Sequence, residues 1–132
     1  MIELVEERKI DIMIKVEIHY YKKTFQSGRE KFIYKDIFVI GHSSDGTTKS
    51  IKCCAGVTAI TCGLVHLLSN TTCLVQINKG FFHYRMGRFE DETNYAINAL
   101  VFQLENIYTI YPEFFSDFQF IEEKETDENI NN

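Results

Sequence analysis

The sequence predicts an α+β domain in which a small mixed or antiparallel sheet packs on two helices. The predicted order is β-β-α-β-β-α, with a possible final strand. Three observations support it: alternating apolar residues near the N-terminus, a long apolar segment in the middle, and an amphipathic segment around residue 100. The length of 132 residues fits one domain, and a hydrophobic content of 45% is enough to build a core.

The first part of the chain predicts a β-hairpin. In residues 14–20 apolar side chains alternate with polar ones, which is typical of a half-buried strand. Residues 24–30 contain a turn signal at Gly28, and residues 31–41 form the second strand.

The middle of the chain predicts a buried helix and a second hairpin. Residues 53–68 are apolar on nearly all sides of a helix, which is typical of a central position. Such a helix needs cover from several directions, and a second copy of the chain would supply some of it, so we expect a homodimer. Residues 73–77 and 81–86 flank Asn78-Lys79-Gly80 and predict two strands joined by a tight turn.

The last third predicts an amphipathic helix over residues 91–111, which Pro112 stops, and an edge strand over residues 114–121. Residues 122–132 are acidic and nearly without core residues, so we expect a disordered tail. The folded domain is therefore expected over residues 13–121, preceded by an N-terminal extension over residues 1–12.

Charge and composition exclude several classes of protein. The net charge of −5 and the pI of about 5.3 argue against nucleic-acid binding and fit a basic protein partner. The charged N-terminus has no secretory signal, and no apolar stretch reaches the ~20 residues needed to span a bilayer. We therefore expect a cytoplasmic protein whose four cysteines are reduced.

A histidine and a cysteine bracket the loop between the second strand and the central helix. His42 follows the strand, and Cys54 comes 12 residues later, at the predicted start of the helix. The N–H groups and partial positive charge of a helix start favour a thiolate and could hold an oxyanion. A cysteine beside a histidine forms a nucleophile with its base, and Thr58 lies one helical turn beyond Cys54 on the same face.

Other roles for these residues are open on the pattern alone. Cys53 competes with Cys54 as the nucleophile, since adjacent residues of a helix point in different directions. A cysteine at a helix start is more often a small buried residue than a catalytic one. A less favoured alternative is a metal site built from Cys62, His66, Cys73 and His83. Because no CxxC pair is present, we expect no metal ion.

The segment GHSSDGTTKSIKCCAGVTAI resembles the signature of the ribosomal-processing cysteine protease family, Prp. Gly41-His42-Ser43 matches the Gly-His-Ala with which a strand of that family ends. Cys54-Ala55-Gly56-Val57-Thr58 matches its Cys-Ala-Ala/Gly-Val-Ser at the start of a helix, at the same separation. The likeness covers most of the chain, from MIKVEIHY at Met13 to IYPEFF at residues 110–115.

The resemblance implies a small homodimeric cysteine endopeptidase without a cofactor. Such enzymes remove the N-terminal leader of one large-subunit ribosomal protein, the twenty-seventh in the usual naming, and so permit ribosome assembly. By the motif, Cys54 is the nucleophile and His42 is the general base of a dyad. Gly41, Ala55 and Thr58 form the substrate and oxyanion neighbourhood. The implied partners are the ribosomal protein precursor and a second copy of the chain, without a membrane or direct nucleic-acid binding.

The sequence departs from the family pattern in the loop. The family usually carries an Asp three residues before the cysteine and a Gly shortly before that Asp, where this chain has Ile51 and Lys49. Asp45 could substitute from within the loop. The missing acid motivates an alternative hypothesis, a catalytically impaired ribosome-associated binding protein of the same fold.

Overall fold

The structure is a computed structural model that describes residues 13–42, 45–68 and 73–124, with only the backbone of residues 64–67. Its elements are β1 (Ile14–Thr24), β2 (Glu30–Ile40), α2 (Thr48–Leu67), β3 (Leu74–Asn78), β4 (Phe81–Arg85), α3 (Asp91–Ile110), the 3-10 helix η1 (Pro112–Phe114) and β5 (Phe115–Glu122). This order confirms the predicted α+β fold, including the final strand. The predicted N-terminal extension lies outside the described residues.

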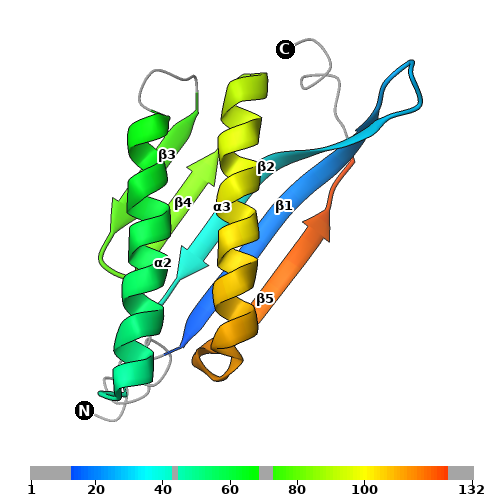
Figure 1. Ribbon diagram of the computed structural model, residues 1–132. Coiled ribbons are helices and arrows are strands. Elements are labelled where there is room, and N and C mark those ends of the chain that lie inside the picture. The colour runs from blue at the N-terminus through cyan, green and yellow to red at the C-terminus, as the bar shows by residue number, and fades with distance from the viewer. Residues whose placement is uncertain (1–12, 43–44, 69–72, 125–132) are drawn as a thin grey trace.

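The five strands form one mixed sheet in the order β3-β4-β2-β1-β5. Neighbouring strands are antiparallel except β1 and β5, which run parallel. The two helices lie side by side and antiparallel on one face of the sheet (Figure 1). The end of β2, the start of α2 and the turn between β3 and β4 therefore meet at the same end of the molecule (Figure 1).

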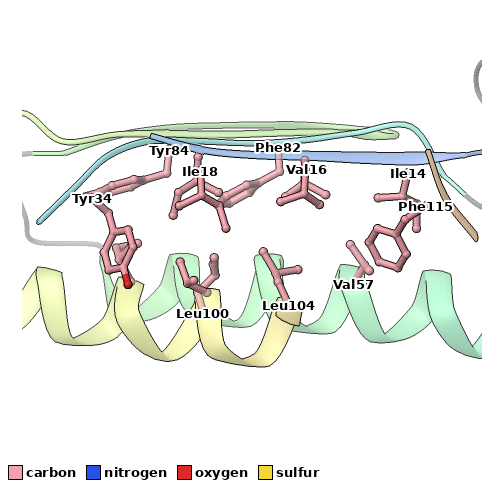
Figure 2. Close-up of a cluster of buried hydrophobic side chains, with 14 of the residues drawn as sticks. Ile14, Val16, Ile18, Tyr34, Val57, Phe82, Tyr84, Leu100, Leu104 and Phe115 are labelled. Atoms are coloured by element: carbon pink, nitrogen blue, oxygen red, sulfur yellow. The ribbon is translucent and has the colours of Figure 1, made fainter. Parts of the chain in front are cut away.

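The core lies between the sheet and the helices, as Figure 2 shows. The predicted alternation along β1 buries Ile14, Val16 and Ile18, each at most 1% exposed. From α3, Leu100 and Leu104 point toward these side chains and are also fully buried. The predicted amphipathic pattern of α3 therefore identifies the side of the helix that covers the sheet.

The opposite face of the sheet carries charged and polar side chains. His83 Nε2 lies 2.9 Å from Asp36 Oδ1, and His19 Nδ1 lies 2.8 Å from Glu123 Oε1. These two histidines make cross-strand and surface contacts, as expected for histidines on strands. None of the helices in the described part of the chain is long and apolar enough to cross a membrane.

The C-terminal strand extends slightly into the predicted acidic tail. β5 ends at Glu122, and the Glu123 N–H donates a hydrogen bond of 2.7 Å to the Tyr20 carbonyl. Pairing with β1 and ion pairs from Glu123 to His19 and Lys35 hold these residues on the sheet. Residues 125–132 of the predicted tail lie outside the described residues.

Candidate active site

His42 leaves β2 through a glycine that no other residue could replace. Gly41 has a φ of +90°, and a Cβ there would lie 2.1 Å from the Met13 carbonyl oxygen. The Gly41 N–H donates a hydrogen bond of 2.8 Å to the Gly80 carbonyl in the turn between β3 and β4. This contact fixes the backbone of the predicted base against that turn.

The helix that carries Cys54 begins earlier than predicted. α2 starts at Thr48, five residues before the predicted start at Cys53. Thr47 caps it: the Thr47 hydroxyl oxygen accepts a hydrogen bond from the Ser50 N–H at 3.2 Å, and the Thr47 carbonyl accepts one from the Ile51 N–H at 3.1 Å. A threonine cap of this kind satisfies the N–H groups of the first turn.

The prediction that Cys54 stands at a helix N-terminus is therefore wrong. Cys54 lies six residues after Thr48, in the second turn of α2. In an α-helix a residue at this depth donates its N–H to the carbonyl four residues earlier, and the partial positive charge is confined to the first turn. The N–H groups of the helix start lie one turn before this thiol and are therefore not the oxyanion donors that the sequence predicted.

Asp45 holds the start of α2. Its Oδ1 accepts hydrogen bonds from the Thr47 N–H at 2.9 Å and from the Thr47 hydroxyl at 2.6 Å. Hydrogen bonds from the hydroxyls of Ser50 and Thr47 keep the pKa of Asp45 below its ordinary value. Among the described residues these contacts all lie at the beginning of the helix. Asp45 therefore holds the start of α2, and no hydrogen bond joins it to His42 in the described part of the chain, so its suggested role in orienting His42 stays a prediction.

His42 and Cys54 line the same cavity, which we call the hairpin cavity. It has a volume of about 490 Å³ and lies between α2 and the β3–β4 hairpin. Both side chains are partly exposed. Gly41 and Thr58 also line the cavity, so four of the five predicted site residues meet there. The fifth, Ala55, does not line it and is exposed on the other side of α2.

The two adjacent cysteines differ sharply in their surroundings. Cys53 is 0% exposed and belongs to the hydrophobic core. Burial raises the pKa of the Cys53 thiol to about 11, with smaller contributions from Cys54 and Glu113. Cys53 is therefore a neutral thiol at physiological pH, and the geometry favours Cys54 as the reactive one.

The sequence did not indicate that the β3–β4 turn forms a wall of the cavity. Asn78, Lys79 and Gly80 lie opposite α2, and Phe81 and Phe82 follow them along the apolar wall. The only signal was the predicted hairpin itself. Its position beside His42 results from the pairing of β4 with β2, which brings Phe81 opposite Ile40.

The described residues contain no cluster of three or more His, Cys, Asp or Glu side chains that could hold a metal ion. Of the alternative metal ligands, Cys62 lines the hairpin cavity and His83 bonds to Asp36 on the other face of the sheet. The side chain of His66 lies outside the described residues.

No protein-family model and no curated protein matches the sequence, but solved structures match the fold. The essential ribosomal processing protease Prp from S. aureus, in complex with a covalently linked product peptide, matches with a TM-score of 0.60 and 24% identity. The match covers 84% of this chain and 100% of that chain. The chain has the Prp fold.

Two further structures agree with this result. Prp from S. aureus with a substrate peptide gives a TM-score of 0.59 at 22% identity, over 84% of this chain and 100% of that one. SMU.848 from Streptococcus mutans gives a TM-score of 0.62 at 17% identity, over 84% of this chain and 96% of that one. The resemblance to Prp predicted from the loop motif is thus confirmed for the fold.

Proposed function

We propose that this chain is a cysteine endopeptidase that removes the N-terminal leader of a large-subunit ribosomal protein, the twenty-seventh, in the cytoplasm. The observation that carries the proposal is that His42 and Cys54 line one cavity, although 12 residues separate them in the chain. The fold is that of a ribosomal processing protease, and the S. aureus enzyme holds a covalently linked product peptide. A covalent link to a peptide is what a nucleophilic mechanism requires.

In the proposed reaction the Cys54 sulfur attacks the carbonyl carbon of the scissile peptide bond. A C–S bond forms, and His42 takes the thiol proton and then delivers it to the leaving amine as the C–N bond breaks. Water, deprotonated by His42, then attacks the thioester carbonyl, and the C–S bond breaks as the proton returns to the sulfur. The leader leaves with a new C-terminal carboxylate. Thr58 and Asn78 line the cavity, and we propose that the hydroxyl of one and the side-chain amide of the other donate hydrogen bonds to the oxyanion.

The cavity and the charge suit the proposed substrate. Val57, Phe81 and Phe82 give the cavity an apolar wall that would accept a leader rich in apolar and aromatic residues. The net charge of −5 would attract a basic ribosomal protein. The proposed active form is a homodimer, and light scattering that gives a monomer mass at every concentration would contradict that part.

The direct test is incubation of the purified protein with the ribosomal protein precursor of the same organism, read by intact-mass spectrometry. We expect one cut that separates the leader from the mature protein. A precursor in which the leader residues around the cut are scrambled is the matched control and should stay intact. If the native precursor also stays intact under reducing conditions, the proposed function is rejected.

The absence of the usual acid at Ile51 supports a second candidate, a binding protein of the same fold that has lost turnover. The two candidates differ in the reactivity of Cys54. The enzyme should be alkylated at Cys54 by iodoacetamide at neutral pH much faster than a model thiol peptide, since a neighbouring base activates the sulfur. A rate equal to that of the model peptide, together with tight binding of an uncleaved precursor, would favour the binding protein.

Gly80 is expected to position His42. Gly80 has a φ of +70°, and a Cβ there would lie 3.0 Å from Cδ2 of the His42 ring. We therefore expect Gly80→Ala to displace the imidazole and lower kcat for leader cleavage roughly 10- to 100-fold, because small misplacements of a catalytic group are costly. KM should change little.

Gly28→Ala is the matched control for this variant. Gly28 also has a positive φ, +85°, in a hairpin turn, but a Cβ there would meet nothing within 4 Å. Both variants should lose about 1–2 kcal/mol of unfolding free energy from the strained backbone, measured by urea denaturation. If both lose activity equally, Gly80 has only a structural role.

A further inference from the structure

A second hollow adjoins Cys54 on the outer side of α2, and we call it the outer hollow. Its volume is about 640 Å³, and it is lined by Gly46, Ser50, Ile51, Cys54, Ala55, Thr58 and Ala59. Cys54 and Thr58 line both this hollow and the hairpin cavity. Cys54, the proposed nucleophile, therefore lies on the ridge between two depressions of the surface.

The outer hollow is mainly apolar, and Ile51 is the largest side chain that lines it. Ile51, Ala55 and Thr58 follow one another at helical spacing along α2, and Ile51 is 62% exposed. An exposed isoleucine alone is ordinary on a protein surface. Here the side chain stands one turn before the nucleophile, on the wall of a hollow that includes it.

The backbone under Ile51 is fixed. The Ile51 N–H bonds to the Thr47 carbonyl, and its neighbour Ser50 is 0% exposed and donates a hydrogen bond of 2.9 Å from its hydroxyl to the same carbonyl. Asp45 in turn holds Thr47. The cap at the start of α2 thus presents Ile51 on a rigid support, as a specificity-determining side chain requires.

An extended peptide that reaches Cys54 must use this surface. Successive side chains of an extended strand point to opposite sides. When the scissile carbonyl lies at the sulfur on the ridge, one flanking side chain points toward the hairpin cavity and its neighbour across the scissile bond points toward the outer hollow.

We propose that the outer hollow is a second substrate subsite for an apolar side chain, with Ile51 as its specificity-determining residue. This inference rests on the proposed function. It goes further because it concerns both substrate residues that flank the scissile bond. One of them is held in the hairpin cavity, and the other is assigned to the outer hollow with an apolar preference. An acid at position 51, usual in the family that the loop resembles, would give this hollow a negative charge in place of an apolar wall.

The test compares peptides that differ only at the flanking residue assigned to the outer hollow. This residue is leucine, asparagine or lysine. For the native protein we expect the leucine peptide to exceed the asparagine peptide in kcat/KM by roughly 10- to 100-fold, the range typical of an apolar pocket. In Ile51→Asp the ratio should fall to near one, and the lysine peptide should gain relative to both.

The matched control is Ile110→Asp. Ile110 is a helical isoleucine with 63% exposure that lines neither hollow. It should keep the native ratio. The inference is overturned if Ile51→Asp also keeps the ratio, if it slows all peptides by the same factor, or if it only changes the oligomer mass in light scattering, which would make Ile51 an interface residue.

A binding experiment distinguishes failure of the proposed function from failure of the proposed subsite. Binding of the same peptides to Cys54→Ala, measured by fluorescence anisotropy, reports the preference without turnover. A leucine preference in binding that Ile51→Asp removes would support the subsite even if the native protein cleaves nothing. Cleavage by the native protein without any preference at this residue would reject the subsite alone.

Discussion

Cys54→Ala is expected to lower the rate of leader cleavage by roughly a thousandfold or more, as removal of a nucleophile does in hydrolases. The physical reason is that only Cys54 of the adjacent pair lines the cavity that also holds His42. The rate of precursor cleavage in single-turnover mass spectrometry measures the effect. The variant should still fold, because Cys54 is only partly buried and the change removes one atom.

Cys53→Ala is the matched control for the neighbouring thiol. Its side chain is 0% exposed in the core, so the variant should lose about 1–2 kcal/mol of unfolding free energy, a usual cost for a core substitution. It should keep cleavage within a few-fold.

Peptide mapping after brief alkylation at pH 7 to 9 gives an independent readout. The raised pKa of Cys53, about 11, keeps that thiol protonated over this whole range, so the native protein should be labelled at Cys54 and not at Cys53. If Cys53→Ala abolishes cleavage and Cys54→Ala does not, the assignment of the nucleophile is wrong.

His42→Ala is expected to lower leader cleavage roughly 100- to 10,000-fold, the range that a general acid–base residue contributes. His42 shares the hairpin cavity with Cys54, and its backbone is fixed by the bond from Gly41 to Gly80. Alkylation of Cys54 at pH 7 should slow in the same variant, because the sulfur loses its base. Added imidazole, which can enter a partly open cavity, should restore part of the rate.

His83→Ala controls for the loss of a histidine in general. Its imidazole bonds to Asp36 and stacks on Phe38 on the other face of the sheet, with ring centroids 4.1 Å apart. That variant should lose stability while keeping native kcat. Cleavage by His42→Ala at the native rate, or equal losses of kcat in both variants, would show that His42 is not the base.

The secondary structure could be predicted because its signals are local. The alternation of Ile14, Val16 and Ile18 matched a strand with one buried face, and the apolar spacing of α3 matched the face that covers the sheet. These patterns report burial directly, so tertiary contacts did not overturn them.

The start of α2 was missed because it depends on side-chain capping. Thr47, Thr48 and Lys49 have no apolar periodicity and therefore resemble a loop. The helix begins there because the Thr47 hydroxyl accepts from the Ser50 N–H while Asp45 holds Thr47. The available signal was Thr47 itself, because threonine is a preferred N-cap residue, but no Glu or Gln follows three residues later to strengthen it. The early start of α2 matters for the chemistry, because it places Cys54 in the second turn and away from the helix terminus.

The walls of the site could be predicted only in part. His42 and Cys54 were identified from their spacing, but Asn78, Lys79 and Gly80 were not. Their position depends on which strand pairs with β2, and strand pairing is decided by the whole sheet rather than by the residues of the turn. The outer hollow likewise exists only because α2 extends back to Thr48 and presents Ile51 beside Cys54.

The parallel pairing of β1 with β5 links the beginning and the end of the folding chain. The Ser116 hydroxyl lies 3.4 Å from the Ile14 carbonyl across 102 residues of sequence, and Ile14 is itself part of the hairpin cavity. Contacts of such high contact order form late, because a long loop must close before they stabilise anything. During translation His42 and Cys54 emerge well before β5 exists. The sheet that borders the hairpin cavity is therefore complete only once synthesis has passed Phe115, and the proposed activity would begin only after that point in a nascent copy.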